Sequence, residues 1–195
     1  MTAKKESIWR LVIVLTTISL LAALALTGVY ALTKGPIEKG QKEKKEKALY
    51  AVLPKFEGSV VDTVIIDENN EAVPVHLAID KEGRLCGAGI ETYTLKAFSG
   101  RFDLMVGFDA DGVIVNTEVI KSAETPGLGD KINKSKSDFA NQFNGKNPAE
   151  FNLSVKKDKG EVDAITAATI SSRAYCDAVQ RAYDIFTKIK EDYHE

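Results

Sequence analysis

The chain has 195 residues, of which 44% are hydrophobic and 28% charged, and its formal net charge is −2. A balance so close to neutral gives no indication of a nucleic-acid partner, and none is expected. Its two cysteines, Cys86 and Cys176, lack the close spacing of zinc or cluster ligands, so no metal site is expected, and whether the two pair in a disulfide stays open.

The first patterned segment is an uncharged run over residues 11–33. About 23 residues rising ~1.5 Å each give roughly 34 Å of helix, enough to cross a hydrocarbon core about 30 Å thick. Trp9 and Tyr30 lie near its ends, as interfacial aromatics do. The alternative is a signal peptide cleaved near residues 23–25, but the uncharged run continues past them. Residues 1–33 are therefore predicted to be an N-terminal cytoplasmic tip and one transmembrane helix in a lipid bilayer.

Residues 34–54 are predicted to form a helical stalk. Gly35-Pro36 is expected to break the first helix or start the next, and Pro54 to end the stalk. The stalk is rich in Lys and Glu, with apolar residues only toward its end, so its last turns are expected to dock on the following domain. More lysines follow the membrane span than precede it. That count by itself places the C-terminal side in the cytoplasm, although the rule is weak before a long domain.

Residues 55–195 are predicted to form one domain of the α+β class. Its first half is β-rich, with turn signals at Asn69-Asn70, Glu82-Gly83 and Asp111-Gly112. Five segments have alternating, apolar or β-branched patterns: Ser59–Asp67, Val73–Asp80, Arg84–Leu95, Arg101–Phe108 and Val113–Lys121. The short connections predict a mainly antiparallel sheet with helices packed on it.

The segment Glu124-Thr125-Pro126-Gly127-Leu128-Gly129-Asp130 follows the last predicted strand. Pro126 and Gly127 predict a turn, and Gly129 adds a second permissive backbone position. Such a loop exposes backbone N–H groups and holds the apolar side chain of Leu128 at its tip, which suits a planar heterocycle with polar edges. A plain solvent loop is the alternative.

The remaining chain is predicted to hold a short helix over Ser135–Phe143, a short strand over Phe151–Val155 and a long C-terminal helix. The last helix is indicated by apolar residues that keep the 3.6-residue period from Ala174 to Ile189. This helix is expected to bury one stripe on the sheet.

Asp163-Ala164-Ile165-Thr166-Ala167-Ala168-Thr169-Ile170-Ser171 immediately precedes that helix. A helix N-terminus offers unpaired N–H groups and partial positive charge, so it is a natural seat for a phosphate. Thr169 would place a hydroxyl on this seat, and Ala167 and Ala168 leave room for a bulky group. The alternative is a helix cap made by Thr166 or Thr169, with Ser171 and Ser172 exposed in the first turn.

Together the two motifs resemble the covalent FMN-binding domain found in the G subunit of the Rnf electron-transport complex and the C subunit of the sodium-translocating NADH:quinone reductase. The resemblance implies that a flavin transferase esterifies the phosphate of FMN to Thr169, and that Thr166, Ala167, Ala168 and Ser171 belong to the binding site. It also implies that Glu124, Thr125, Gly127 and Leu128 lie against the isoalloxazine. Ala167 stands where the family usually has Gly, a substitution that strains the turn if this residue has a positive φ.

The resemblance covers nearly the whole chain and is greatest to the Rnf G subunit. It implies an electron-transfer subunit of a membrane ferredoxin:NAD oxidoreductase that couples electron flow to ion transport, with no substrate site of its own. The implied partners are the other membrane subunits, and the implied location of the flavin domain is the outer side of the inner membrane. The alternatives are the quinone-reductase C subunit, which is usually longer, and an anchored binding or scaffold module without flavin.

Overall fold

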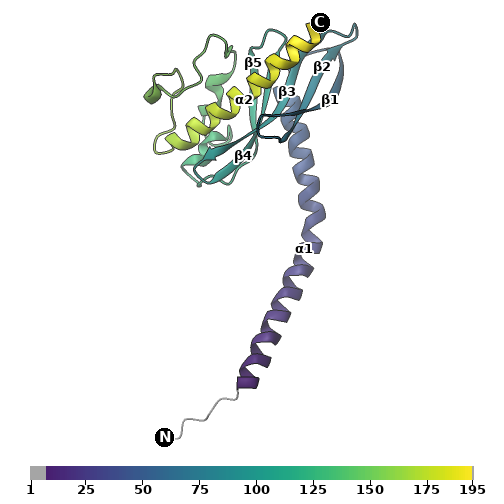
Figure 1. The fold of residues 1–195 in the computed structure, drawn as a ribbon, viewed down its shortest axis with the longest axis vertical. Coiled ribbons are helices and arrows are strands. Elements are labelled where there is room, and N and C mark those ends of the chain that lie inside the picture. The colour runs from purple at the N-terminus through teal and green to yellow at the C-terminus, as the bar shows by residue number, and fades with distance from the viewer. Residues whose placement is uncertain (1–7, 195) are drawn as a thin grey trace. The chain divides into compact units, whose positions relative to one another are not determined.

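A computed structural model describes residues 8–194 of the chain, and the side chains up to residue 191. Lys4 and Lys5, part of the predicted cytoplasmic tip, lie outside the described residues. The chain divides into two units, one ending at Lys44 and one beginning at Lys45. Figure 1 shows the long helix of the first unit and the sheet of the second.

Helix α1 spans Ile8–Val52, and its part up to Lys44 belongs to the first unit. Its apolar part is long and apolar enough to cross a membrane, judged by length and composition. The hydroxyls of Thr17, Thr27 and Thr33 donate to backbone carbonyls one turn earlier, at 2.8–2.9 Å. These bonds satisfy polar groups that would otherwise face an apolar surrounding.

The expectation that Gly35-Pro36 breaks the helix is wrong, because α1 continues through Pro36. A proline removes one backbone hydrogen bond of the helix, whereas the flanking segments contribute many. Pairs of opposite charge one turn apart, such as Lys34–Glu38, add about 0.2 kcal/mol each on the exposed surface. The helix therefore ends only at Val52, two residues before Pro54.

The second unit is built on one five-stranded sheet in which each strand pairs antiparallel with its neighbour in sequence. The prediction of an antiparallel α+β domain is confirmed. The strands are β1 (Gly58–Ile66), β2 (Ala72–Asp80), β3 (Leu85–Ala97), β4 (Gly100–Asp109) and β5 (Ile114–Lys121).

Three of the four hairpins share one local mechanism. Asp67, Asp80 and Asp109 each precede a turn, and one carboxylate oxygen of each accepts backbone N–H groups two and four residues later at 2.9–3.0 Å. A short side chain that bonds its own turn fixes where one strand ends and the next begins. The turns predicted from the sequence at these places are confirmed.

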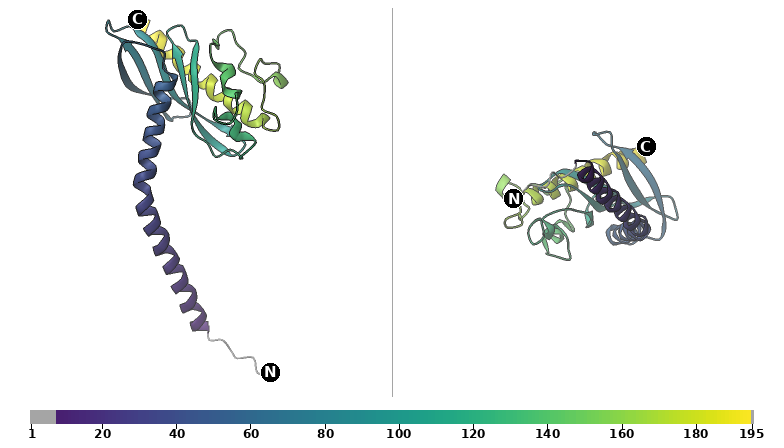
Figure 2. Two further views of the ribbon diagram at one scale, coloured as in Figure 1. Left: turned by 180° about the vertical axis from the view of Figure 1, so that it is seen from behind. Right: turned by 90° about the horizontal axis from the view of Figure 1, so that it is seen from below.

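The two faces of the sheet are covered by different helices. Helix α2 (Thr169–His194) packs on one face and buries its apolar stripe against β-strand residues such as Ile90 and Leu104. On the opposite face, Ala48 and Val52 at the end of α1 pack with Met105. Figure 2 shows α2 and these last turns on opposite sides of the sheet.

Docking of the α1 end needs glycine on the sheet. A Cβ atom at Gly107 would lie 1.9 Å from the carbonyl oxygen of Val52, and one at Gly89 would lie 2.9 Å from Leu49. Backbone therefore packs directly on backbone here. The predicted docking of the last stalk turns is confirmed.

The chain between β5 and α2, which the structure describes throughout, has no strand and only three 3₁₀ helices: η1 (Gly129–Ile132), η2 (Phe139–Phe143) and η3 (Lys156–Asp158). The helix predicted over Ser135–Phe143 is therefore mostly wrong, since only its second half is helical. The strand predicted over Phe151–Val155 is also wrong. Most of its apolar side chains are buried against the core, and within the described residues only an isolated bridge joins Val155 to Val162.

Candidate functional site

Helix α2 begins directly after a tight turn. The backbone N–H of Ala168 donates to the carbonyl of Ile165 at 3.0 Å, and Ala167 between them has φ = 63°. This is the left-handed region, which costs a residue with a side chain roughly 1–2 kcal/mol. Ala167, which stands where the family usually has Gly, therefore strains the turn, because its φ is positive.

The turn is tied to α2 by Ser172. Its hydroxyl accepts the N–H of Ile165 at 2.9 Å and donates to the carbonyl of Ala168 at 3.0 Å. Ser171 and Ser172 are buried, which contradicts the helix-cap alternative, because that alternative has both serines exposed in the first turn. The backbone of the turn thus bonds to a serine inside the first helical turn, and the hydroxyl of Thr169 stays available for other partners.

The loop after β5 forms the turn that its sequence predicts. Gly127 has φ = 78°, and the N–H of Leu128 donates to the carbonyl of Thr125 at 3.2 Å. A second bond joins the N–H of Gly127 to the carboxylate of Asp130 at 2.8 Å. Pro126 and Gly127 therefore occupy the two central positions of one turn, which presents Leu128 beyond it.

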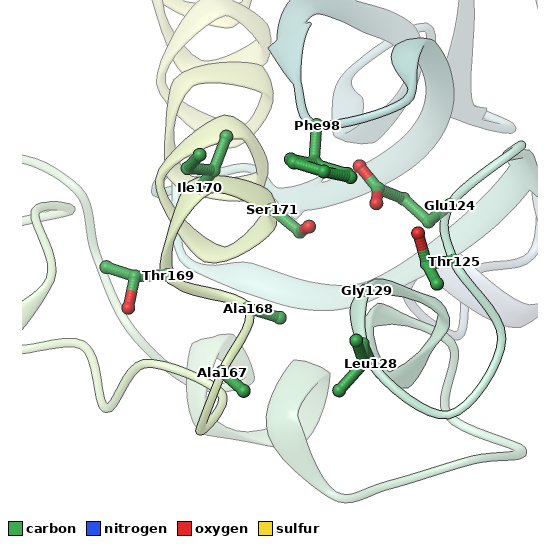
Figure 3. A pocket seen from close by; sticks show the side chains of 10 residues that line it. All are labelled: Phe98, Glu124, Thr125, Leu128, Gly129, Ala167, Ala168, Thr169, Ile170 and Ser171. Atoms are coloured by element: carbon green, nitrogen blue, oxygen red, sulfur yellow. The ribbon is translucent and has the colours of Figure 1, made fainter.

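These two segments line the same cavity of about 330 Å³, together with the tip of the β3–β4 hairpin (Figure 3). Segments about 40 residues apart in sequence thus face each other across one space. The lining residues are Phe98, Glu124, Thr125, Leu128, Gly129, Ala167, Ala168, Thr169, Ile170 and Ser171.

The structure brings most of the candidate site residues to this cavity. Two of them, Thr166 and Gly127, are not among its lining residues: Thr166 lies in the turn before α2, and Gly127 shapes the loop. The candidate residues from the sequence do not include Phe98, Gly129 and Ile170, which also line the cavity. Phe98 is 67% exposed, and an aromatic residue at a hairpin tip was the signal that could have revealed it.

Glu124 is the unusual polar group of the cavity. Its side chain is buried, and its Oε2 atom has no hydrogen-bond partner among the described residues. The Oε1 atom accepts the backbone N–H of Ser99 at 3.4 Å. A Cβ atom at position 129 would lie 2.2 Å from Oε2, so Gly129 is needed for this carboxylate to sit here. A buried oxygen without a donor costs about 1–3 kcal/mol, and a ligand N–H would remove that cost.

Thr169 lies at the edge of the cavity. Figure 3 shows its side chain at the start of α2, pointing away from Glu124 and Leu128. Its hydroxyl oxygen lies 3.3 Å from the ammonium nitrogen of Lys157. The site therefore has an apolar interior with one orphaned carboxylate oxygen, and a hydroxyl beside a cation at its rim.

The cavity lies at the N-terminus of α2, in a part of the chain that matches a known cofactor-binding domain. A family model described as the FMN-binding domain matches residues 97–184, which include every lining residue of the cavity.

Curated relatives cover more of the chain. The G subunit of the ion-translocating oxidoreductase complex from Aliivibrio fischeri is 34% identical over 202 residues, covering 98% of this chain and 93% of the relative. The corresponding protein from Haemophilus influenzae is 32% identical over 177 residues, covering 87% and 86%. The chain belongs to this family of G subunits.

Among solved structures, the chain is similar to the crystal structure of Shewanella oneidensis NqrC, with a TM-score of 0.46 and 18% identity over 74% of each chain.

Proposed function

We propose that this protein is the electron-carrying G subunit of a membrane-bound, ion-translocating ferredoxin:NAD oxidoreductase, and that its FMN is esterified to Thr169. The observation that carries the proposal is the cavity itself. Its interior is apolar and contains the unpartnered Oε2 atom of Glu124. Its rim is the N-terminus of α2, where the hydroxyl of Thr169 lies.

The residues present fit the flavin ring. Leu128, Phe98 and Ile170 offer apolar surface for the faces of an isoalloxazine, and a cavity of about 330 Å³ falls within the range of about 300–1,000 Å³ common for small-molecule sites. The Oε2 atom of Glu124 would accept an N–H from the polar edge of the ring, which gives this oxygen the donor that it lacks.

The start of α2 fits the phosphate. The first N–H groups of a helix have no partner inside the helix and favour negative charge. Thr169 is the first residue of α2, so its hydroxyl and those N–H groups lie at the same end. A phosphoester at Thr169 would hold the flavin on an open surface, where a dissociating cofactor would be lost.

Bound FMN would supply a carrier of one or two electrons. The protein's own part is limited: Glu124 and the loop orient the ring, the apolar side chains keep water from its faces, and Thr169 retains it.

The proposed setting is the inner membrane, with α1 as the single span and the flavin domain on the outer side. The partners are the other membrane subunits of the complex, and a flavin transferase during maturation. The lysines after the span, among them Lys34 and Lys39, oppose this orientation, but the charge rule is weak for a domain of about 150 residues.

The deciding experiment is expression of the full chain with a flavin transferase, followed by mass spectrometry and in-gel flavin fluorescence under denaturing conditions. Wild type should carry one FMN and Thr169→Ala none, whereas Thr166→Ala, whose hydroxyl is not in the cavity lining, should lose labelling only partly. Fluorescence retained by Thr169→Ala would overturn the attachment site. Wild type without any flavin would favour a scaffold module instead.

The ring position has its own test. Leu128→Asp should shift the absorption spectrum or potential of the attached flavin without preventing attachment, because the tether lies elsewhere. An unchanged spectrum and potential would contradict a ring packed on this loop.

A further inference from the structure

Three consecutive side chains of η3 each contact a different part of the segment that carries Thr169. The ammonium of Lys156 lies 2.7 Å from the carboxylate of Asp163, the first residue of the motif. The ammonium of Lys157 lies 3.3 Å from the hydroxyl of Thr169. Asp158 accepts two hydrogen bonds from Arg173 in the first turns of α2. We call Lys156–Asp158 the clamp turn.

The clamp turn is fixed at its base by the backbone. The N–H of Lys156 donates to the carbonyl of Val162 at 2.8 Å, and the N–H of Asp158 donates to that of Val155 at 2.7 Å. Lys159, with φ = 65°, closes the turn. Because both Val155 and Val162 are buried, the turn is anchored in the core although its side chains are exposed.

The bond from Asp158 to Arg173 locks the turn against α2. The two Arg173 nitrogens lie 2.6 and 2.8 Å from the two carboxylate oxygens, which is the paired geometry that gives such contacts their direction. These hydrogen bonds hold the pKa of the Asp158 carboxyl below its ordinary value. The backbone position of Lys157, between two anchored neighbours, is thus set by the fold.

We propose that Lys157 is a positioning residue for covalent flavin attachment, and that the clamp turn exists to hold its ammonium at Thr169. This inference rests on the proposed function. An ammonium has three donors and no lone pair, so Lys157 cannot act as the base. It orients the hydroxyl oxygen by hydrogen bonding and then faces the negative charge of the phosphate that arrives there.

The donor in the attachment step is an activated flavin phosphate, namely a flavin dinucleotide. The bond from Thr169 Oγ1 to the flavin phosphorus forms, and the phosphoanhydride bond of the dinucleotide breaks. The nucleoside monophosphate leaves with that bond's electron pair, and the hydroxyl proton passes to a base of the transferase. The product is a phosphodiester with one negative charge, which the ammonium of Lys157 and the N-terminus of α2 offset.

The clamp turn also contacts Asp163. Asp163 begins the motif but does not line the cavity. Its carboxylate instead bonds Lys156, and its backbone N–H donates to Gln142 at 2.8 Å. Its contribution to attachment is therefore to hold the clamp turn beside the motif.

The test measures the rate at which the purified full chain acquires covalent flavin from flavin dinucleotide in the presence of a flavin transferase. Lys157→Gln should slow labelling roughly tenfold, as expected for loss of one charged donor at an exposed site. Lys157→Arg should restore most of the rate, because a cationic donor is retained. The matched control is Lys159→Gln, which removes the same charge from an exposed side chain directly after the clamp turn.

Each outcome decides the proposal. Equal slowing by Lys157→Gln and Lys159→Gln would overturn the proposal, because it would mean that the positive charge of this segment merely attracts the transferase. A wild-type labelling rate for Lys157→Gln would also overturn the proposal. Unfolding temperatures equal to wild type would show that slowing by Lys157→Gln is not misfolding. If that variant proves unstable, Asp158→Asn, which frees the turn from Arg173 but keeps the lysine, should slow labelling as well. Failure of the proposed function is separate, since it would leave wild type itself unlabelled.

Discussion

Ala167→Gly tests whether the turn before α2 stores strain. Ala167 is exposed and has φ = 63°, so glycine removes a cost of roughly 1–2 kcal/mol and little buried surface. Glycine also gives the unfolded chain more freedom, which opposes the gain by about 0.4–1 kcal/mol. The folded state should therefore gain about 0.5–1 kcal/mol.

For a unit of about 150 residues, 1 kcal/mol shifts the unfolding temperature by about 2–4 °C. Thermal unfolding of the full-length protein in detergent, followed by circular dichroism, should show Ala167→Gly melting about 1–4 °C above wild type. Covalent labelling of Thr169 should proceed at least as fast, since the turn keeps its shape.

The matched control is the reverse change in the facing loop. Gly127 also has a positive φ of 78°, and a Cβ atom there would meet nothing within 4 Å. Gly127→Ala should therefore lower the unfolding temperature, because the backbone strain outweighs the smaller freedom of the unfolded chain and no steric clash contributes. If Ala167→Gly instead lowered the unfolding temperature, the turn would not be strained, and the reasoning from φ would be refuted.

Three further predictions use other parts of the molecule. Gly129→Ala puts a Cβ atom 2.2 Å from Glu124 Oε2, so it should displace that carboxylate and change the spectrum of attached flavin; an unaltered spectrum would contradict the proposed contact with the ring. Glu91, together with Asp62, raises the pKa of His76 above its ordinary 6.5, so the folded state binds this proton more tightly. The resulting stability is complete below about pH 6.5 and is lost as pH rises through the raised value. His76→Gln should therefore flatten the pH dependence of the denaturant midpoint above about pH 6.5, and an unchanged pH dependence would contradict this role of His76. An impermeant amine reagent or a protease should reach the lysines after Thr33 in cells whose outer barrier alone is opened, whereas protection until the inner membrane is lysed would refute the outward orientation.

Local patterns were sufficient for the sheet and its hairpins. Alternating apolar residues follow the two-residue period of a strand, and Asp67, Asp80 and Asp109 bond their own turns, so both signals lie within a few residues. The 3.6-residue period indicated α2 for the same reason. The loop around Gly127 was also predictable, because its conformation depends on Pro126 and Gly127 themselves.

Predictions failed where distant contacts outweigh local preference. Phe151–Val155 has strand-like residues, but a strand needs a neighbour to pair with, and the described part of the chain offers this segment only an isolated bridge. The segment Ser135–Phe143 is too short to sustain an α-helix by itself. The helix-cap alternative, with Ser171 and Ser172 exposed, fails for the same reason: both serines are buried because α2 packs against the sheet and the turn folds back onto Ser172.

Residues close together along the chain were enough to predict the strands, the last helix, the long apolar helix and the two motifs that point to a flavin. What the motifs form together depends on tertiary packing. Packing of α2 and the β5 loop on one sheet sets Glu124 and Ala168 around the same cavity, adds Phe98 from a distant hairpin, and brings Lys157 to Thr169. Such contacts are fixed by which surfaces bury each other, and no local pattern encodes that.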